Sequence, residues 1–413
     1  MKVLIVHWLY EPNFLGGGER IVQTLAEGLV VEGHEVVVVT TVPGWRTSIA
    51  SIRGVKVYYI GLRNVYWYLN AGAKRRFLKP LWHILDLNNI AMAREVAKVM
   101  DIERPDIVHS HGLEGFSTAV WRPVKARGLP CIHSMHSYYL LCPRATLFRR
   151  GKNCATLCGQ CRVFASVRRR MAEKLDAVIG CSRFIVNRHL DFSFFRKTPL
   201  REVVYHGYAP GSVSPPRRRR SGKLRVGFLG RLDHTKGIEV LIGAAAPLLK
   251  ECELQIAGKG APAFVEKLKE RAASLAVQFV GFVKAEAFLS EVDVLVVPSL
   301  WNEPSGMVII EAFAQGVPVI GSNRGGIPEC IEENKTGFLF SPEHPETLTA
   351  ALERFISDRD LLARMQVDAL SRSRELLPKR MIDGYLAVYG KALGDTPHRE
   401  EPSSPAVLVQ RGN

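Results

Sequence analysis

Short apolar runs alternate with amphipathic segments along the whole chain. In the first half, β-branched residues fill several of these runs, which is the pattern of strands buried on both faces of a sheet. The segments between several of them carry apolar residues at helical spacing. A second series of the same kind follows after residue 222. The sequence therefore predicts strands at 3–6, 35–40, 55–60, 107–109, 131–134, 177–180, 224–229, 254–257, 278–280, 292–297 and 317–320.

This alternation of strands and helices indicates parallel sheets with helices on both faces. A chain of 413 residues is too long for a single core, so we expect two Rossmann-like, doubly wound domains facing a central cleft. The first should span 1–205 and the second 206–377. A helix at 378–396 is expected to pack back on the first domain, and the polar tail 397–413 is predicted to be disordered.

The basic excess of the chain belongs to its first half. Lys and Arg outnumber Asp and Glu by 56 to 40, and 29 of these cations but only 14 of the acids fall in the first 200 residues. Such a domain attracts an anionic partner: a nucleic acid, a phospholipid headgroup or a phosphorylated substrate. No apolar run is long enough to span a bilayer, and the N-terminal residues do not form a signal peptide. We therefore expect a cytoplasmic protein with reduced cysteines.

Two glutamates bracket an apolar run in the second half. The strand predicted at 292–297 is followed by a helix that should begin near 304–305, which leaves the amides of residues 305–307 as an anion site. Glu303 lies just outside this helix. Glu311 lies inside it, where a carboxylate is costly unless hydroxyl groups, such as those of a ribose, hydrogen-bond to it. The alternative is that Glu303 caps the helix and Glu311 forms an ordinary ion pair.

Two cations follow the strand predicted at 224–229. Arg231 and Lys236 lie in the loop before a helix expected at 238–249. Cations at the carboxyl end of a strand, beside an anion-binding helix start, suit a pyrophosphate. A solvated surface loop is the alternative for either residue alone.

These motifs together resemble a known family. Gly230-Arg-Leu…Lys236-Gly, the pair Glu303 and Glu311 separated by seven residues, and Gly325-Gly-Ile-Pro-Glu329 are similar to the motifs of the family 4 glycosyltransferases. These are retaining enzymes of the two-domain GT-B fold, and the resemblance covers about residues 1–390. It implies two Rossmann-like domains, with the nucleotide sugar bound to the second.

The resemblance also assigns roles to residues of the donor site. It implies that Arg231 and Lys236 neutralise the diphosphate, that Glu303 contacts the sugar hydroxyls and that Glu311 takes the ribose. The amides at the helix start should bind the diphosphate, and the base should pack near 281–283. The full set of donor-binding residues on the second domain is then Val283, Ser305, Gly306, Met307, Val308 and Glu311.

A glycine-rich loop follows the first strand at 14–20. Its position at a helix start suits a phosphate, but its spacing is not that of a dinucleotide-binding fingerprint, which argues against an NAD enzyme. By the resemblance, it closes over the donor diphosphate and the acceptor, with Gly16 and Gly17 closest. A simple tight turn is the alternative.

Histidines end the strands predicted at 107–109 and 131–134. We expect His109 to point into the core in a structural role, and His111 to face the cleft on the other side of the pleat. The resemblance implies that His111 hydrogen-bonds the transferred sugar, with His136 as a second candidate. His206 stands where the family usually has asparagine, and we assign it no chemical role.

Four cysteines cluster after the strand at 131–134. Their spacing, Cys142-x11-Cys154-x3-Cys158-x2-Cys161, suits a metal clip in a reducing compartment. We predict a structural zinc ion there, with an iron–sulfur cluster as the less favoured metal group. Free thiols in a loop, or redox chemistry, would account for the cysteines without a metal. The resemblance implies no catalytic metal.

The segment 65–82 interleaves aromatic residues with cations, and three arginines follow at 168–170. Trp and Tyr beside Lys and Arg suit a lipid headgroup boundary, so we predict peripheral contact with an anionic membrane. An acceptor-side loop with a partly buried helix is the alternative. No nucleic-acid-binding fold accompanies the segment, so nucleic acid is not the expected partner.

The combined interpretation is a retaining glycosyltransferase. It should move a sugar from a UDP- or GDP-sugar to a glycan or lipid-linked acceptor, in the synthesis of a cell-envelope polysaccharide or glycolipid. Two rival functions stay open: a non-catalytic protein of GT-B type that binds nucleotide or nucleic acid, and a sugar-nucleotide epimerase or phosphorylase of the same fold.

Overall fold

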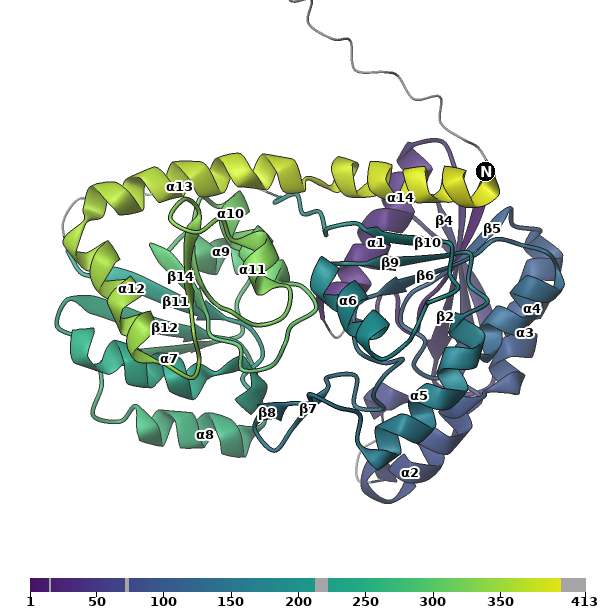
Figure 1. Ribbon diagram of the computed structural model, residues 1–413, viewed down its shortest axis with the longest axis horizontal. Coiled ribbons are helices and arrows are strands. Elements are labelled where there is room, and N and C mark those ends of the chain that lie inside the picture. The colour runs from purple at the N-terminus through teal and green to yellow at the C-terminus, as the bar shows by residue number, and fades with distance from the viewer. Residues whose placement is uncertain (15, 71–73, 212–221, 395–413) are drawn as a thin grey trace, which may run out of the picture.

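The protein consists of two α/β domains, each built around a parallel sheet (Figure 1). The computed structural model describes residues 1–14, 16–70, 74–211 and 222–394. The fold class expected from the sequence is confirmed. The Pro- and Arg-rich segment at 215–220, which we expect to be a solvated linker between the domains, and the tail 397–413 lie outside the described residues.

The first domain contains an eight-stranded sheet in the order β10-β9-β6-β5-β1-β2-β4-β3. All neighbouring strands are parallel except the edge pair β3 and β4, which is antiparallel. The strands are β1 (Lys2–Val6), β2 (Glu35–Val42), β3 (Thr47–Ile52), β4 (Val55–Gly61), β5 (Ile107–Ser110), β6 (Cys131–Met135), β9 (Ala177–Gly180) and β10 (Leu200–Val203). A two-stranded hairpin, β7 (Phe148–Arg149) and β8 (Lys152–Asn153), stands apart from this sheet.

The second domain contains a six-stranded parallel sheet in the order β13-β12-β11-β14-β15-β16. In both sheets the order changes direction near the first strand of the domain, and ligands bind at such switch points in doubly wound folds. The strands are β11 (Leu224–Leu229), β12 (Cys252–Ala257), β13 (Val277–Gly281), β14 (Val294–Val297), β15 (Val319–Ser322) and β16 (Gly337–Phe340).

Helices cover both faces of each sheet (Figure 1). Those of the first domain are α1 (Gly17–Val31), α2 (Lys74–Leu87), α3 (Ile90–Glu103), α4 (Trp121–Ala126), α5 (Gly159–Ala172) and α6 (Arg183–Asp191). Those of the second are α7 (Ile238–Ala245), α8 (Pro262–Arg271), α9 (Ala285–Leu289), α10 (Met307–Ala314), α11 (Ile327–Cys330), α12 (Glu346–Ser357) and α13 (Arg359–Ser373), and α14 (Pro378–Leu393) ends the described chain.

Each sheet buries one apolar cluster on each face. Along β1, Val3 and Ile5 pack with α1 and α14, whereas Leu4 and Val6 face the side covered by α3, α4 and α5. This alternation of fully buried residues is the reason that the sequence shows an unbroken apolar run. In the second domain, α7 and α12 cover one face, and α10, α11 and α13 contribute to the cluster on the other.

The last helix connects the two domains. α13 and α14 run along one side of the molecule, and α14 returns from the second domain to lie beside α1 of the first (Figure 1). Its buried Tyr385 and Tyr389 join the apolar cluster of the first sheet. The helix at 378–393 therefore packs on the first domain, although this helix follows the second domain in sequence.

Several element boundaries differ from the sequence prediction. β3 was not predicted because its side chains are mostly exposed, and the edge strands β10 and β16 were not recognised either. The helix expected at 238–249 ends at Ala245, since Pro247 has no amide hydrogen to continue it, and the next turn is a 3-10 helix.

Candidate functional site

The start of α10 lies at the carboxyl end of β14. The helix begins at Met307, with Gly306 as its N-cap, and not near residues 304–305 as the sequence predicted. The preceding segment is held by other groups: Pro304 O accepts a hydrogen bond from Ser182 Oγ at 2.6 Å, and Glu303 O accepts one from Gly326 N at 2.7 Å. Among the described residues, the helix amides without a partner are therefore those of Met307 and Val308, and Ser305 lies before the helix.

Lys236 and Glu303 form a direct pair in front of this helix. Lys236 Nζ donates to Glu303 Oε1 at 2.7 Å, and Ser299 Oγ donates to the same oxygen. Glu303 is almost fully buried. The two predicted site residues are thus brought together although 67 positions separate them in the chain.

Two glycines allow the loops around this pair to approach closely. Gly237 has φ of +68°, and a Cβ there would lie 1.8 Å from Pro298 O. Gly325 has φ of +60°, and a Cβ there would lie 2.1 Å from Glu303 O. Any other side chain at either position would force the Lys236 loop or the 325–326 turn away from Glu303.

The glycine-rich loop of the first domain faces the start of α10. A Cβ on Gly17 would lie 3.0 Å from Met307 Cγ, and one on Gly18 would lie 3.9 Å from His136 Cβ. Gly16 N donates to Glu19 Oε2 at 2.9 Å, which caps α1 and fixes the turn. The predicted residues Gly16 and Gly17 therefore lie at the junction between the domains.

Glu311 lies one turn into α10, mostly buried. It makes no hydrogen bond and no ion pair with the part of the chain that the structure describes. Burial raises the pKa of this carboxyl from its usual 4.5 to about 7, although Arg20 of α1 acts to lower it and Glu286 to raise it. A carboxyl in this state gains from hydroxyl donors, as the sequence argument required.

Arg231 and Val283 lie at the margins of this group. The Arg231 guanidinium pairs with Asp233 at 3.3 Å and is 68% exposed, so it does not join the Lys236–Glu303 pair. Val283 is partly buried and packs on the same apolar cluster as Met307 and Val308. Of the second-domain residues predicted for the donor site, Arg231 is the one that the structure leaves most open to solvent.

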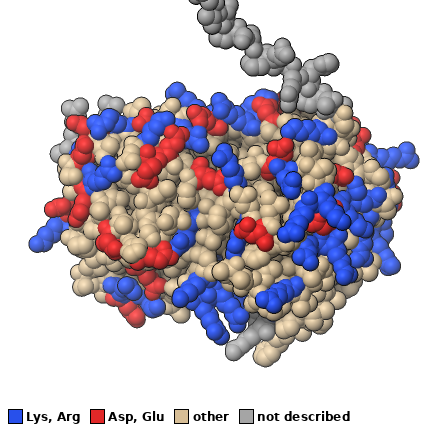
Figure 2. Space-filling view, viewed as in Figure 1, with Lys and Arg blue, Asp and Glu red and all other residues tan. Residues whose placement is uncertain are grey.

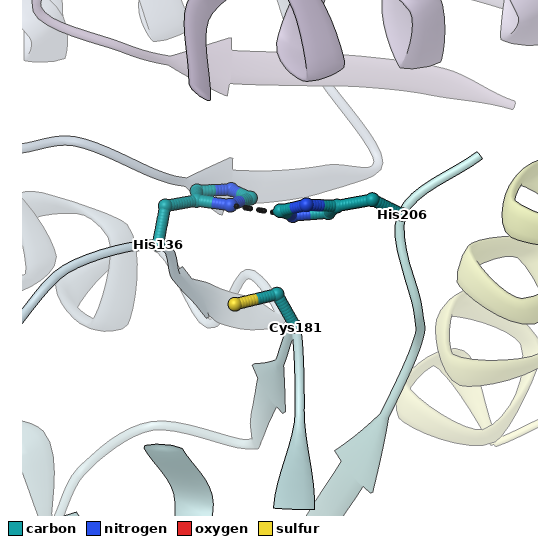
Figure 3. Close-up of side chains that lie close together, drawn as sticks. All are labelled: His136, Cys181 and His206. Carbon is teal, nitrogen blue, oxygen red and sulfur yellow. Dashed lines mark hydrogen bonds between the residues drawn. The ribbon is translucent and has the colours of Figure 1, made fainter. Parts of the chain in front are cut away.

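Histidines form a hydrogen-bonded chain on the first domain's side of the cleft. A bond of 2.8 Å joins His111 Nδ1 to His136 Nε2. A second bond, of 3.2 Å, joins His136 Nδ1 to His206 Nε2 (Figure 3). Burial lowers the pKa of all three, that of His136 to about 4, so the chain is neutral near pH 7. The buried Nε2 of His111 has no partner among the described residues.

The prediction that His109 and His111 point to opposite sides was wrong. Residues two apart on a strand point to the same face, and the two rings lie 4.0 Å apart between centroids. The structural role expected for His109 is confirmed, since its ring nitrogens bond to Tyr389 Oη at 2.6 Å and to Ser134 Oγ at 2.8 Å. His111 is buried rather than open to the cleft.

His7 is a candidate that sequence reasoning missed. It follows β1, the neighbour of β5 in the sheet, and its Nδ1 accepts a hydrogen bond from Gly112 N at 2.8 Å. The neutral ring must then carry its proton on Nε2, which is buried without a partner among the described residues. The signal was available: a polar residue at the carboxyl end of the central strand, beside the strand that ends in His111.

His136, Cys181 and His206 are the one group of described His, Cys, Asp or Glu residues that could hold a metal ion with ligand atoms all within 4.8 Å (Figure 3). Such a set suits zinc or copper. However, the ring nitrogens of His136 and His206 point toward each other and share a hydrogen bond, and Cys181 Sγ donates to Pro304 O at 3.4 Å. Both nitrogens of His136 and the sulfur of Cys181 are therefore already engaged, whereas the buried Nδ1 of His206 has no partner among the described residues.

The four clustered cysteines are neighbours in space. Cys142 and Cys161 are buried in one apolar cluster, Cys154 and Cys158 pack against it, and the Cys161 side chain interacts with those of Cys142 and Cys158. All are free thiols. The Cys161 side chain and nearby amides lower the pKa of Cys142 below its usual range.

The Trp and Tyr residues of 65–82 are buried or partly buried and do not face solvent as the membrane prediction assumed. Trp82 is buried and donates from Nε1 to Tyr66 O at 3.0 Å, and Trp67 Nε1 donates to Thr41 Oγ1 at 3.2 Å. The exposed apolar side chains of this region belong instead to α2, with Phe77 81% exposed and Ile84 60% exposed. None of the described helices is long and apolar enough to cross a bilayer.

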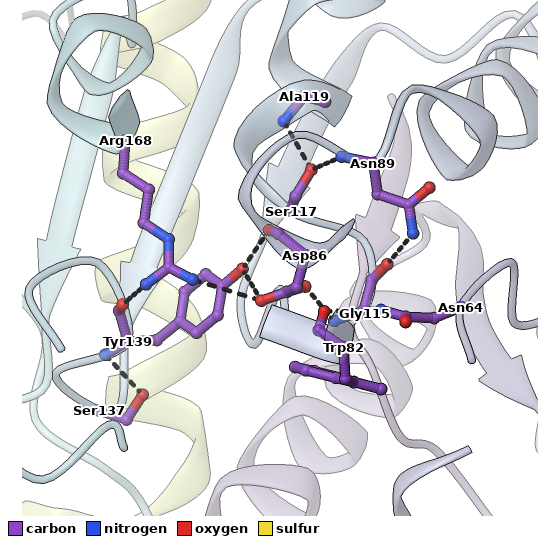
Figure 4. A network of polar contacts seen from close by, with 10 residues as sticks. All are labelled: Asn64, Trp82, Asp86, Asn89, Gly115, Ser117, Ala119, Ser137, Tyr139 and Arg168. Carbon is purple, nitrogen blue, oxygen red and sulfur yellow. Dashed lines mark hydrogen bonds and ion pairs between the residues drawn. The ribbon is translucent and has the colours of Figure 1, made fainter. Parts of the chain in front are cut away.

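A buried polar network holds α2 against α5 (Figure 4). The Arg168 guanidinium of α5 lies 3.3 Å from Asp86 of α2, and neither side chain is exposed. Asp86 also accepts from Tyr139 Oη at 2.7 Å and from Gly115 N at 2.6 Å. Arg168 is therefore structural, whereas the two arginines that follow it, Arg169 and Arg170, are exposed.

Two family models cover most of the chain. The model of "Glycosyl transferase 4-like domain" matches residues 16–206, and that of "Glycosyl transferases group 1" matches residues 214–371. Over 329 residues the chain is 30% identical to an uncharacterised 42.6 kDa protein in the cps region of Klebsiella pneumoniae, an alignment that covers 80% of this chain and 87% of that protein. The chain belongs to the family 4 glycosyltransferases.

Further glycosyltransferases are similar over nearly their full length. A glycogen synthase of Mycobacterium tuberculosis is 26% identical, with 87% of this chain and 86% of that protein aligned. Two solved structures share the fold: sucrose-phosphate synthase of Thermosynechococcus elongatus (TM-score 0.74, 20% identity, 96% of this chain and 100% of that one) and HepE of Anabaena in complex with UDP and glucose (TM-score 0.69, 18% identity, 94% and 99%). The GT-B fold predicted for this glycosyltransferase is confirmed.

Proposed function

We propose that this glycosyltransferase binds a UDP- or GDP-sugar at the start of α10 and transfers the sugar with retention of anomeric configuration. The observation that carries the proposal is the Lys236–Glu303 pair, which lies in front of two unsatisfied helix amides. An ammonium group, two amides and a helix N-terminus form an anion site that suits a diphosphate. The UDP found with HepE supports a nucleotide donor.

The reaction needs stabilisation of the departing diphosphate. The bond between the anomeric carbon and the diphosphate oxygen breaks with its electron pair on that oxygen, and the acceptor hydroxyl oxygen bonds to the same face of the carbon. The acceptor proton passes to the departing phosphate oxygen. Lys236 and the amides of Met307 and Val308 would carry the developing charge, which is the largest electrostatic demand of the step.

The carboxylates would bind the sugars on either side of the diphosphate. Glu303, held by Ser299, would accept hydrogen bonds from hydroxyls of the transferred sugar, and Glu311 from those of the ribose. On the first domain, His111 Nε2 is buried without a partner among the described residues, and it would contact the transferred sugar once the cleft opens to admit the donor. Arg231 would turn from Asp233 toward the diphosphate, a movement that its exposed position permits.

Contacts between the domains support a closed cleft in which water is excluded. Glu329 of α11 accepts hydrogen bonds from Arg183 N at 2.8 Å and Phe184 N at 2.7 Å at the start of α6, and from Tyr205 Oη at 3.0 Å. Asn302 O accepts another from Tyr138 Oη at 2.7 Å. Exclusion of water limits hydrolysis of the donor in favour of transfer.

We further propose that the acceptor is a glycan or lipid-linked sugar met at an anionic membrane, with α2 and α5 as the docking face. Exposed apolar side chains project from both helices: Phe77, Leu81, Ile84, Leu85, Val163 and Val167. Arg162, Arg169 and Arg170 lie exposed beside them on α5, and Figure 2 shows Lys and Arg gathered on this side of the first domain. Apolar side chains flanked by cations complement an acidic lipid surface.

Donor screening tests the enzymatic proposal. UDP-, GDP- and ADP-sugars are added separately, and the thermal unfolding midpoint is measured, followed by NMR analysis of the product with a glycan acceptor. A UDP- or GDP-sugar should raise the midpoint, and the product should keep the donor's anomeric configuration. Stabilisation by none of the sugars, or an inverted product, contradicts the proposal. An epimerised donor or phosphate-dependent cleavage would favour an epimerase or a phosphorylase.

Vesicle sedimentation tests the docking face. Binding to phosphatidylglycerol vesicles should exceed binding to phosphatidylcholine vesicles and should fall with salt. Phe77→Ser with Ile84→Ser should reduce it at least tenfold, while Val367→Ser, an exposed apolar residue on the second domain, should not. Equal binding by both variants would remove α2 from the interface.

A further inference from the structure

We propose that Cys142, Cys154, Cys158 and Cys161 hold a structural zinc ion, and that this clip fixes the β7–β8 hairpin against the loop that carries Glu303. The zinc site is inferred from the cysteines and their surroundings alone. Its effect on the donor rests on the function proposed above.

The four cysteine side chains pack in one apolar cluster of the first domain. The Cys161 side chain interacts with those of both Cys142 and Cys158. In a tetrahedral zinc–thiolate site the sulfurs lie about 3.8 Å apart. The present sulfurs are less compact, since they do not form a group within 4.8 Å. Zinc would displace the thiol protons and draw the sulfurs together.

Backbone amides already converge on two of the sulfurs. The amides of Arg144, Thr146 and Leu147 donate to Cys142, and the amide of Cys161 donates to Cys158. The first turn needs positive φ at Ala145 (58°) and Leu147 (49°), a conformation that non-glycine residues rarely adopt. Successive amides aimed at one atom bind an anion, here a thiolate, and such supporting hydrogen bonds to the ligand atoms are typical of metal sites.

The cluster lies at the base of the hairpin. Cys142 precedes β7 and Cys154 follows β8, and Cys154 N donates to Leu147 O at 2.7 Å to close the loop. Each strand has two residues, and a hairpin of this size is not stable by itself in water. Cys142 and Cys154 flank the two ends of the hairpin, whereas Cys158 is the N-cap of α5 and Cys161 lies within that helix. An ion shared by all four would anchor both ends of the hairpin to the first domain.

The hairpin reaches from the first domain to the second (Figure 1), where it contacts the loop that precedes Glu303. Asn153 Nδ2 donates to Leu300 O at 2.8 Å, and Asn302 N donates to Asn153 Oδ1 at 2.8 Å. The loop bound in this way leads directly into Glu303. Asn153 is therefore a positioning residue, which acts on the donor through the backbone of this loop.

Elemental analysis of the full chain, purified without chelator, tests the zinc site. One zinc per chain is expected. The double variant Cys158→Ser with Cys161→Ser should lose it, whereas Cys252→Ala, a buried cysteine of β12 outside the cluster, should keep it. A chain with neither zinc nor iron overturns the clip, and iron in place of zinc overturns the identity of the ion.

Limited proteolysis tests the effect on the hairpin. Arg149 and Arg150 are exposed at its tip, so trypsin cleavage there, mapped by mass spectrometry, reports whether the hairpin is held. Removal of zinc by a chelator should speed cleavage at these two arginines about tenfold and leave other sites unchanged. Unchanged cleavage with zinc removed overturns the anchoring role.

A variant of Asn153 separates the clip from the donor site. Asn153→Ala should keep its zinc and its folding but raise the donor KM about tenfold with little change in kcat, because the loop before Glu303 loses both hydrogen bonds. An unchanged KM overturns the positioning role. Zinc and zinc-dependent protection in a chain that binds no nucleotide sugar would instead contradict the proposed function and leave the clip intact.

Discussion

The two walls of the cleft hold opposite kinds of polar group. On the second domain, Lys236 and Glu303 are charged and paired in front of a helix N-terminus. On the first, His7, His111 and His136 are buried, and burial lowers the pKa of each so that the rings are neutral near pH 7. One wall carries fixed charge, and the other carries only hydrogen-bonding capacity.

This difference matches what each wall would meet in the proposed reaction. A diphosphate that gains charge as it departs is stabilised by cations and amides placed in advance. A sugar hydroxyl needs a donor or acceptor, and an unneeded charge there would carry a desolvation cost. The buried Nε2 atoms of His7 and His111 have no protein partner in the described structure, as groups that wait for a hydroxyl should.

The largest expected effect comes from removing the charge of Lys236 on the second domain. Lys236→Met should reduce kcat/KM by about 10²–10³-fold, because the developing phosphate charge loses its ammonium partner. The thermal midpoint should stay close to that of the wild type. Lys267→Met is the matched control, since Lys267 is an exposed lysine of the same domain, paired with Glu239. Comparable losses in both variants would contradict a specific role for Lys236.

A somewhat smaller loss is expected on the neutral wall. His111→Asn can keep the hydrogen bond to His136 but lacks Nε2, and it should reduce kcat by about 10²-fold while the donor Kd changes little. His109→Phe should instead lower stability and leave kcat nearly unchanged. It removes the ring nitrogens that bond to the hydroxyls of Tyr389 and Ser134, which costs about 1–3 kcal/mol of stability. If His109→Phe were the less active variant, the assignment of the two histidines would be reversed.

The pH dependence of the reaction should reflect Glu311 of the second domain and not the buried histidines of the first. Glu311, whose pKa is about 7, must be ionised to accept ribose hydroxyls, so kcat/KM for the donor should rise about tenfold per pH unit below 7 and level off above it. The histidines add no break near pH 6.5, because burial lowers their pKa. Glu311→Gln should remove this limb of the profile, and a profile that is unchanged in that variant would contradict the role of Glu311.

The smallest effect concerns stability without ligand. The pKa of Glu311 is higher in the folded state than its usual 4.5, so the stabilising contribution of this group is complete below pH 4.5 and is lost as the pH rises through 7. Glu311→Gln should therefore raise the free energy of unfolding by about 1 kcal/mol at pH 8 and change it little at pH 4.5. Urea unfolding at both pH values measures this, and a destabilised variant at pH 8 would contradict the sign.

The sequence predicted the buried strands well, because strands buried on both faces leave unbroken apolar runs. β11 has the predicted bounds, and β9 does too. The exposed edge strand β3 leaves no such run, so it could be recognised only from its pairing with β4. The start of α10 was placed too early because the residues before it are held by Ser182 and Gly326, contacts between segments far apart in sequence.

The second wall was also easier to predict than the first. Lys236, Glu303 and Glu311 lie in local motifs whose spacing is visible in the chain. The histidine chain is assembled from the ends of separate strands and from the linker between the domains, so only the sheet order brings His7, His111, His136 and His206 together. The pairing of Arg231 with Asp233 was likewise not visible, since either partner could have turned elsewhere.

The most direct test of a diphosphate site in front of α10 is the contribution of the second phosphate to binding. Isothermal titration of UDP and UMP, or of GDP and GMP if the protein prefers guanine, should show much tighter binding of the diphosphate by the wild type. In Lys236→Met this preference should fall by at least tenfold, while the affinity for the monophosphate is nearly unchanged. Equal preference for the diphosphate in both proteins would contradict the account.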